Sequence, residues 1–559
     1  MKRRIIIYQV LPRLFGNDNH SCEPWGDKKT NGCGRMDDFT PRALQQIASL
    51  GTTHVWYTGL IEHATQTDYS IYGIAGDVPD VVKGIAGSPY AIRDFYDIDP
   101  DLATSVPARM QEFEALVSRT HEAGLGVIID FVPNHVARQY HSDIQPEDST
   151  HLGADDNTSK AFDANNNFYY IPGDELHAAD FTMETYREYP AKATGNDNFS
   201  SWVGRNDWYE TVKLNYGIDY QNGRTNHFSP IPRTWKQMLH ILLYWAGKGV
   251  DGFRCDMAEM VPVEFWKWAI TQVKAKYPGI IFIAEVYNPM EYRNYVYQGH
   301  FDYLYDKVGL YDCLRAVTCN HAQATAITRC WQDVDDIRDR MLNFLENHDE
   351  QRLASKFFAG EPEKGRAPLL VSACMGTNPV MIYFGQELGE RGMDAEGFSG
   401  RDGRTTIFDY WSVDSIRRWR NGGRFDNRHL TPSEVQLQQY YSRVLTLCNE
   451  EPALREGEFY DLMYANLQNP HFNSGRQYAF LRRKERELIL VVANFDGRDA
   501  EVEVNIPEHV FDFYALPQTN QVKATSLMSG TPFHISFNSQ EPTRILVPAH
   551  SGRMLKFIL

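Results

Sequence analysis

Acidic side chains close four short apolar runs of the sequence. These acids are Asp130, Asp256, Glu285 and Asp349, the last of which directly follows His348. Carboxyl groups can act as nucleophiles and as general acids or bases, and catalytic groups collect where the strands of a parallel barrel end. A single acid in such a position often only caps the following helix. Four at corresponding positions favour a shared active site, and no cluster of His and Cys suggests a catalytic metal.

A repeated unit carries these acids: a helical pattern ends at a glycine, and a short apolar run follows. In one copy, apolar residues at helical spacing from Met110 to Val117 precede Gly124 and the run at 127–130. Continuous apolar strands that alternate with amphipathic helices indicate a parallel sheet covered on both faces. Eight such units fit a (β/α)8 TIM barrel, with an open doubly wound sheet as the alternative. The eight candidate strands are residues 5–10, 54–57, 127–130, 250–256, 280–285, 301–305, 341–345 and 380–384.

The length of 559 residues is too great for one compact core, so several domains are expected. The repeat is interrupted between His135 and about Leu214 by a segment rich in Asn, Asp, Gly, Tyr and His, which predicts an inserted subdomain after the third strand. Beyond a last helix, short strands with polar turns predict an antiparallel β-sandwich. We expect a barrel at 1–135 and 215–450, an inserted subdomain at 136–214 and a C-terminal sandwich at 451–559.

The acid-bearing segments also match known motifs. In order along the chain they resemble the four short motifs of the α-amylase family: 130–135 (DFVPNH), 252–256 (GFRCD), 284–287 (AEVY) and 344–349 (FLENHD). Three further segments resemble the family's opening strand, an aromatic loop and the eighth strand: 8–13 (YQVLPR), 90–100 (YAIRDFYDIDP) and 382–387 (IYFGQE). The resemblance spans about residues 1–450. Each motif alone is weak, but together a chance match is very improbable.

This resemblance implies a retaining glycoside hydrolase that acts on α-linked glucose polymers or oligomers. Asp256 would be the nucleophile and Glu285 the acid and base, while Asp349 would hold the hydroxyls of a distorted sugar. Retaining enzymes place the two reacting carboxyls about 5 Å apart, and the acid returns as the base for water. Arg254 lies two residues before Asp256, on the same side of the strand, and would keep that carboxyl ionised. A purely structural salt bridge is the alternative.

Further binding residues follow from the same motifs. His135 and His348 match histidines that donate hydrogen bonds to the sugar at the cleavage point, and Tyr90 matches an aromatic residue that stacks beneath that sugar. The residues before Tyr90 are Ser-Pro where the family usually has His-Gly. Arg352 and Arg404 are candidate loop contacts to substrate.

Asn134 matches a residue that binds a structural Ca²⁺ in many members of the family. The inserted segment offers Asp155, Asp156 and Asp163 as further oxygen ligands. An asparagine that holds the loop by hydrogen bonds, without a metal, explains the residue equally well. No cofactor is expected to be required for the chemistry itself.

A departure from the family pattern concerns substrate choice. Many α-amylases carry Lys-His three and four residues after the nucleophile, on the leaving-group side, whereas this chain has Glu259 and Met260. The segment 211–215 (TVKLN) resembles a motif of the neopullulanase and cyclomaltodextrinase branch, which also carries acids or amides after the nucleophile. We therefore expect contact of Glu259 with substrate and a preference for short malto-oligosaccharides, cyclodextrins or pullulan over starch.

The amino-acid composition limits the kinds of partner that the protein is expected to bind. The net charge is −17, which argues against nucleic acid and anionic membranes as partners, although solubility alone also explains it. The N-terminal apolar run follows a basic MKRR start but is too short for a signal peptide, and no window approaches the roughly 20 apolar residues of a membrane span. These features predict a cytoplasmic protein with no membrane contact. Cys22 and Cys33 could form a disulfide, but nothing requires one, and the sequence gives no oligomeric state.

Two other functional classes remain open. A 4-α-glucanotransferase would use the same three acids, with a sugar hydroxyl in place of water, so the motifs do not separate it from a hydrolase. Some relatives keep the barrel as a non-catalytic interaction subunit, but those usually lose the acids and gain a membrane helix. This chain keeps Asp256, Glu285 and Asp349, which favours an enzyme.

Overall fold

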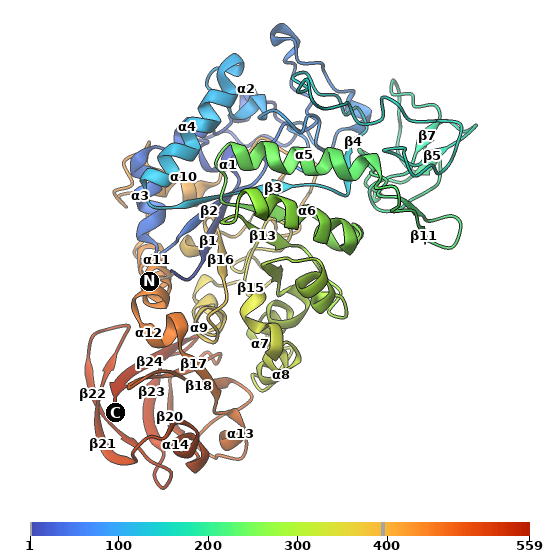
Figure 1. Ribbon diagram of the computed structural model, residues 1–559. Coiled ribbons are helices and arrows are strands. Elements are labelled where there is room, and N and C mark those ends of the chain that lie inside the picture. The colour runs from blue at the N-terminus through green and yellow to red at the C-terminus, as the bar shows by residue number, and fades with distance from the viewer. Residues whose placement is uncertain (1–2, 393–396) are drawn as a thin grey trace.

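The computed structural model describes residues 3–392 and 397–559, and its centre is a closed barrel of eight parallel strands (Figure 1). The predicted barrel is confirmed, and the open doubly wound sheet is wrong, because β16 returns to pair with β1. All eight predicted runs contribute a strand. In order around the barrel they are β1 (Ile6–Val10), β2 (His54–Tyr57), β3 (Gly126–Phe131), β12 (Gly252–Cys255), β13 (Ile281–Ala284), β14 (Tyr303–Tyr305), β15 (Met341–Phe344) and β16 (Val380–Tyr383).

The continuous apolar character of these strands follows from burial on both faces. Ile7, Trp56 and Ile128 belong to a cluster inside the barrel, whereas their neighbours Ile6 and Val55 pack in the larger cluster beneath the helices. Alternate residues of one strand thus fill two separate cores. The outer layer includes α3 (Pro41–Ser49), α4 (Arg109–Glu122), α5 (Arg233–Gly247), α6 (Val263–Lys276), α7 (Asp312–Thr318), α8 (Ala326–Asp333), α9 (Arg366–Cys374), α10 (Asp414–Arg420) and α11 (Pro432–Glu450).

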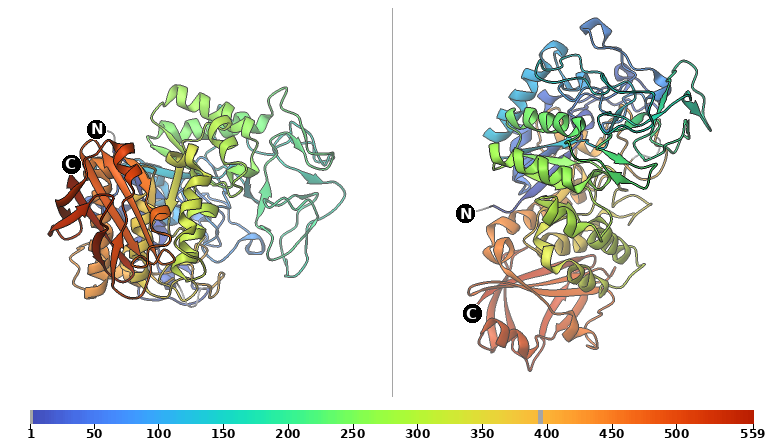
Figure 2. Two further views of the ribbon diagram at one scale, coloured as in Figure 1. Left: turned by 90° about the horizontal axis from the view of Figure 1, so that it is seen from below. Right: turned by 45° about the vertical axis from the view of Figure 1, so that its right-hand side comes forward.

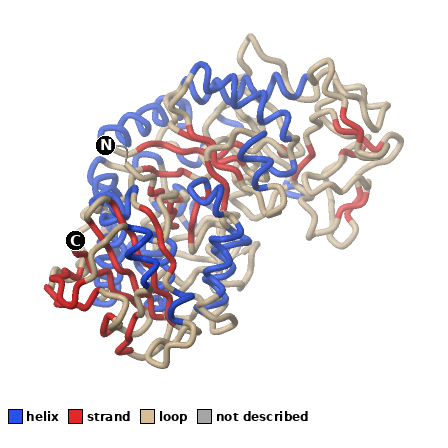
Figure 3. Tube along the Cα trace, turned by 60° about the horizontal axis from the view of Figure 1, so that its bottom comes forward, coloured by secondary structure: helices blue, strands red, loops and turns tan. Residues whose placement is uncertain are grey.

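Between β3 and α5 the chain leaves the barrel as a loop-rich segment that projects to one side (Figures 1 and 3). Within it β4 pairs with β9 next to the barrel, and the other strand pairs are only two residues long. The strands are β4 (His135–Ala137), β5 (Tyr170–Ile171), β6 (His177–Ala178), β7 (Ala191–Lys192), β8 (Trp202–Val203), β9 (Thr211–Lys213), β10 (Ile218–Asp219) and β11 (Thr225–Asn226).

The C-terminal part is built from antiparallel strands, as predicted for a β-sandwich, and lies on the opposite side of the barrel from the projecting segment (Figure 2). A six-stranded sheet in the order β17-β18-β19-β24-β21-β22 accompanies the pair β20-β23. The helix α12 (Pro452–Glu456) connects this part to the barrel. The strands are β17 (Glu458–Asp461), β18 (Gln477–Lys484), β19 (Glu487–Asn494), β20 (Ala500–Val504), β21 (Thr519–Ser526), β22 (Pro532–Phe537), β23 (Thr543–Val547) and β24 (Ser551–Ile558), with α13 (Met463–Asn466) and α14 (Glu508–Tyr514) between them.

Two expectations about the ends and the thiols can be compared with the structure. Met1 and Lys2 of the basic start lie outside the described residues. Within residues 3–392 and 397–559, no helix combines the length and the apolar character needed to cross a membrane. Cys22 and Cys33 are free thiols that approach different carbonyl oxygens, those of Ser412 and Asp101.

Candidate active site

A cavity of about 310 Å³ opens at the carboxyl ends of the barrel strands. Asp256 and Glu285 enter it directly after β12 and β13, and Asp349 enters it from the loop after β15. Parallel strands bring their carboxyl ends to one rim, so acids distant in sequence meet there. The lining residues are Lys83, Ser88, Tyr90, His135, Trp208, Glu210, Thr211, Asp256, Met257, Glu285, Tyr287, Asp349, Ile407 and Phe408.

Arg254 on β12 joins the first two acids. Its Nη1 lies 2.7 Å from Asp256 Oδ1, and its Nη2 lies 2.8 Å from Glu285 Oε2. The arginine is fully buried, its Nε donates to the hydroxyl of Tyr305, and its Nη1 lies 3.4 Å from Asp130. The structure thus places Asp256 and Glu285 on neighbouring nitrogens of one guanidinium.

Asp256 is almost completely buried, and its environment acts on its charge in two directions. Burial raises the pKa of Asp256 well above its ordinary value, the charge of Glu285 adds to the rise, and Arg254 opposes it. The two carboxyls share one cation. The cation is therefore what favours an ionised Asp256 in this buried position.

Glu285 is held by groups on both sides of its carboxyl. The hydroxyl of Tyr287 donates to Oε1 at 2.7 Å, and the backbone N–H of Met257 donates to Oε2 at 2.8 Å. Met257 has a left-handed backbone, with φ of 45°, which is unfavourable for a residue with a side chain. That conformation directly after Asp256 directs the Met257 N–H toward Glu285.

The third acid lies beside a histidine. His348 Nε2 is 3.0 Å from Asp349 Oδ2, while Gln9 Nε2 lies 2.8 Å from His348 Nδ1 and can only donate. His348 Nε2 therefore carries the proton toward Asp349. Burial raises the pKa of Asp349, but His348, Arg254 and Arg404 outweigh burial and lower the pKa to about 2.

Tyr90 and His135 complete the wall around these acids. The Tyr90 ring stacks on His348 with 5.1 Å between centroids, and its hydroxyl lies 3.4 Å from Asp130. His135, at the start of β4, is buried against Trp208, with 5.2 Å between the ring centroids. Burial, and after it the charge of Lys213, lowers the pKa of His135 to about 3, so the imidazole is neutral and offers one N–H.

Arg254 and His348 contact the acids of the cavity without being part of its lining, and three further predicted contacts do not line it either. Glu259 accepts a hydrogen bond from the backbone N–H of Asn288, and Arg404 pairs with Asp402. Arg352 is fully buried behind the wall, where it pairs with Glu346 at 2.9 Å and donates to Thr405 and to a carbonyl. The structure does not bring these three side chains to the lining of the cavity.

Several lining residues were missed by sequence reasoning. Lys83 lies on the loop before Tyr90, while Trp208 and Glu210 precede β9, and no periodic pattern marks these segments. Tyr287 could have been found, because it lies two residues after Glu285 in an extended segment and so projects to the same side.

The surroundings of Asn134 suit an ammonium group rather than a calcium ion. Its Oδ1 accepts a hydrogen bond from Lys213 Nζ at 2.7 Å, and the same Nζ pairs with Asp197 at 2.6 Å. The acids expected as metal ligands have other partners: Asp155 and Asp156 bind Arg233, and Asp163 binds Lys160. In the described part of the chain no three His, Cys, Asp or Glu side chains gather as a metal site would need. The residues present therefore do not fit the Ca²⁺ expected from the resemblance.

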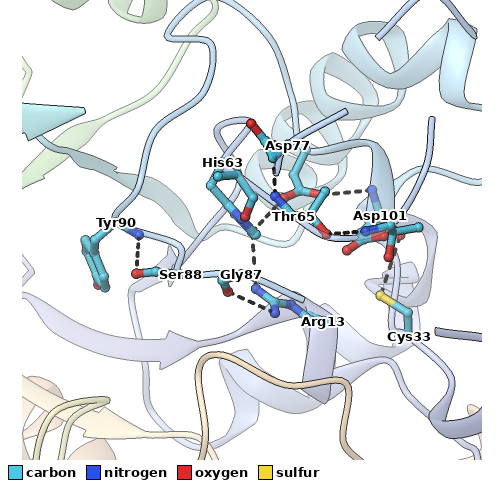
Figure 4. Close-up of polar contacts among 12 residues, drawn as sticks. Arg13, Cys33, His63, Thr65, Asp77, Gly87, Ser88, Tyr90 and Asp101 are labelled. Carbon is cyan, nitrogen blue, oxygen red and sulfur yellow. Dashed lines mark hydrogen bonds and ion pairs between the residues drawn. The ribbon is translucent and has the colours of Figure 1, made fainter. Parts of the chain in front are cut away.

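A buried polar network fixes the loop that carries Ser88 and Tyr90 (Figure 4). Arg13 donates to the Gly87 carbonyl at 3.4 Å and lies 3.2 Å from His63, which in turn pairs with Asp99 at 2.6 Å. At the end of the loop the Tyr90 N–H donates to Ser88 Oγ. The network thus ties the loop that carries Tyr90 to Arg13, in the short helix after β1, and to His63, in the segment after β2.

The chain is similar in sequence to a known protein family and to several named proteins. Residues 9–425 match the family described as alpha amylase, catalytic domain. The chain is 24% identical to alpha-amylase 3 of Dictyoglomus thermophilum, covering 99% of this chain and 93% of that protein. It is 20% identical to neopullulanase 2 of Thermoactinomyces vulgaris, covering 90% and 72%. Maltase A1 of Drosophila melanogaster is 25% identical, but the match covers 44% of this chain and only 33% of that protein, so the chain spans about a third of its length.

Solved structures give the same fold. A maltogenic alpha-amylase from Thermotoga neapolitana superposes with a TM-score of 0.64 at 20% identity, and the match covers 99% of each chain. At this identity the likeness concerns the arrangement of barrel, projecting segment and C-terminal sheet.

Proposed function

The chain belongs to the α-amylase family of glycosidases, and from this premise we propose that it hydrolyses α-1,4-glucosidic bonds by a retaining double displacement. The proposal rests on the position of Arg254, whose guanidinium contacts Asp256 at 2.7 Å and Glu285 at 2.8 Å. Carboxyls on neighbouring nitrogens of one guanidinium lie close together. This supports a retaining enzyme, in which they are about 5 to 5.5 Å apart, over an inverting one, which needs about 6.5 to 9.5 Å for a water.

In the proposed first step Asp256 attacks the anomeric carbon, the bond to the leaving oxygen breaks, and Glu285 gives that oxygen its proton. In the second step Glu285 removes a proton from water, the water oxygen attacks the same carbon, and the ester to Asp256 breaks. Arg254 stabilises the ionised carboxylate at each stage, while Asp349, which accepts from the His348 N–H, faces the sugar hydroxyls. The stacked ring of Tyr90 supplies an apolar surface for the sugar.

The substrates we propose are short α-glucans: malto-oligosaccharides, cyclodextrins or pullulan. The names of two similar proteins, a neopullulanase and a maltogenic amylase, support this choice. Glu259 gives it no support, because its carboxylate is engaged with the backbone of Asn288. The modest cavity of about 310 Å³ is consistent with a small number of bound sugar units.

Substrate preference is tested by kcat/KM on maltohexaose and on soluble starch. We expect maltohexaose to be preferred by at least about tenfold, because a small site gains little from a long chain. Product analysis with and without added maltose separates hydrolysis from glucosyl transfer. A tenfold preference for starch would identify an endo-amylase and contradict the proposed substrates, and net chain lengthening in excess water would favour the glucanotransferase.

We also propose that Lys213 provides the positive charge that a structural Ca²⁺ supplies in many relatives. Its side chain is 2% exposed, and its ammonium joins Asn134 to Asp197. It therefore ties the loop after β3 to the projecting segment, as a metal between these two parts would. The fold then requires no metal at this position.

Chelation and mutation test the role of Lys213. We expect EDTA to change the melting temperature by less than about 1 °C, since nothing that binds only the native state is removed. Lys213→Met should lower it by about 4 °C or more, because it leaves the buried Asn134 oxygen without a donor and Asp197 without a cation. Lys160→Met is the matched control, since its ion pair with Asp163 lies on the surface of the same segment and should matter little. A fall in melting temperature with EDTA that Ca²⁺ reverses would contradict the proposal.

A further inference from the structure

An ion pair with unused hydrogen-bonding capacity lies in the wall of the cavity. Lys83 Nζ is 3.0 Å from Glu210 Oε1, and the two side chains are only 12% and 5% exposed. Both residues line the cavity. The other oxygen of the carboxylate, Glu210 Oε2, is buried and has no hydrogen-bond partner among the described residues. A buried acceptor without a donor costs free energy, so a ligand that supplies one gains affinity there.

The backbone holds this pair in a defined place. Residues 84–87, directly after Lys83, pack against neighbouring backbone so closely that a Cβ on Gly84 would lie 2.2 Å from the Phe408 carbonyl oxygen. A Cβ on Gly87 would lie 1.7 Å from the carbonyl oxygen of Ala64. Glu210 directly precedes β9, whose pairing with β4 also positions His135. Two separate segments of the chain, one closely packed and one paired in a sheet, therefore meet at the ion pair.

The neighbours of the pair indicate which end of a substrate it faces. Glu285 must face the leaving group, and its own contacts are Tyr287, Met257 and Arg254. Glu210 instead lies beside the β4–β9 pair: its carbonyl accepts from Arg138 N–H at the end of β4, and Trp208 packs on His135. The pair therefore lies on the His135 side of the cavity, apart from the contacts that hold Glu285.

We propose that Lys83 and Glu210 bind the terminal, non-reducing glucosyl unit, so that the enzyme acts on chain ends. A sugar hydroxyl both accepts and donates, so the 4-hydroxyl of this unit can accept from the Lys83 ammonium and donate to the Glu210 carboxylate. In an internal α-1,4-linked unit O4 is glycosidic and has no hydrogen to donate, so it supplies no donor to the Glu210 carboxylate. Sites built to bind a hydroxyl strongly reject analogues that lack it.

The inference rests on the proposed function and narrows its substrates. Linear malto-oligosaccharides have a non-reducing end, whereas cyclodextrins have none and pullulan has few. Within the substrates proposed above, linear oligosaccharides should therefore be preferred.

The test compares maltoheptaose with the same chain blocked at its non-reducing end by a 4,6-acetal, and with cyclomaltoheptaose. We expect kcat/KM of the wild-type protein to be at least about 100-fold higher for the free chain than for the other two. In Lys83→Met/Glu210→Gln the value for the free chain should fall by about 30-fold or more, and the preference should shrink to less than about threefold. Lys248→Met, which removes a surface ion pair with Glu114, is the matched control and should keep the wild-type preference.

Equal cleavage of free and blocked chains by the wild-type protein overturns the inference and leaves the proposed function intact. Failure to cleave any α-1,4-glucan overturns both. A variant that keeps the wild-type preference also overturns the assignment to Lys83 and Glu210. The wild-type comparison needs no substitution, so it decides the question even if the double variant does not fold.

Discussion

Asp256→Asn removes nearly all activity, with an expected fall in kcat on maltohexaose of about 10⁴-fold or more. The amide keeps the shape of the carboxyl and an oxygen that can accept from Arg254, but it cannot form an ester with the anomeric carbon. The melting temperature should stay close to that of the wild-type protein. Initial rates and thermal unfolding of the purified variant provide the measurement.

Asp251→Asn is the matched control. Asp251 lies directly before β12, at the opposite end of the strand from Asp256, and interacts with His121 and the Val127 N–H outside the cavity. We expect it to keep activity within about threefold of wild type, since it touches no reacting group. A folded Asp256→Asn protein that loses less than about 100-fold would show that another group forms the intermediate.

Glu285→Gln affects substrates according to their leaving groups. For malto-oligosaccharides, whose leaving alkoxide needs a proton, the rate of the first step should fall by about 10³-fold, within the range that general acid catalysis contributes. For glucosides of acidic phenols the fall in that step should be less than about tenfold, because these groups leave without protonation. Single-turnover rates on a series of aryl glucosides measure the difference. Equal losses on both kinds of substrate would contradict the role of Glu285 as acid.

The fold was predictable because a parallel barrel leaves a strong imprint on its strands. Runs such as 127–129 and 380–384 are apolar at every position, since one set of side chains fills the barrel and the other packs beneath helices. An acid that directly follows such a run must lie at the common rim. The meeting of Asp256 and Glu285 in one cavity follows from this topology, whereas Asp349 reaches the cavity from the loop after β15.

What the sequence could not provide depends on loops that meet only in three dimensions. Lys83 and Glu210 are 127 positions apart by their numbers and have no pattern around them, yet they form an ion pair in the cavity. Glu259 was expected at the substrate because it follows the nucleophile closely. The left-handed turn at Met257 and the short helix after it bring its carboxylate to the Asn288 N–H instead.

The buried arginine Arg352 illustrates a second limit. An arginine next to a catalytic motif resembles a substrate contact in sequence, but burial next to Glu346 makes the two charges partners of one another. Lys213 is similar: its segment was noticed as a motif, but its contact with Asn134 depends on the pairing of β4 with β9. Local sequence indicates which residues are unusual, and tertiary structure decides what they touch.

The central claim is that Asp256 forms a covalent bond with the transferred sugar, and trapping that intermediate tests it most directly. A fluorinated α-glucosyl fluoride slows the second step more than the first, so the glycosyl-enzyme ester accumulates and survives digestion to peptides. Mass spectrometry of the peptides then identifies the modified residue. The account predicts one glucosyl-derived adduct per protein, on Asp256, and none in Asp256→Asn. An adduct on another carboxylate, or turnover of the reagent with inversion and no adduct at all, would contradict it.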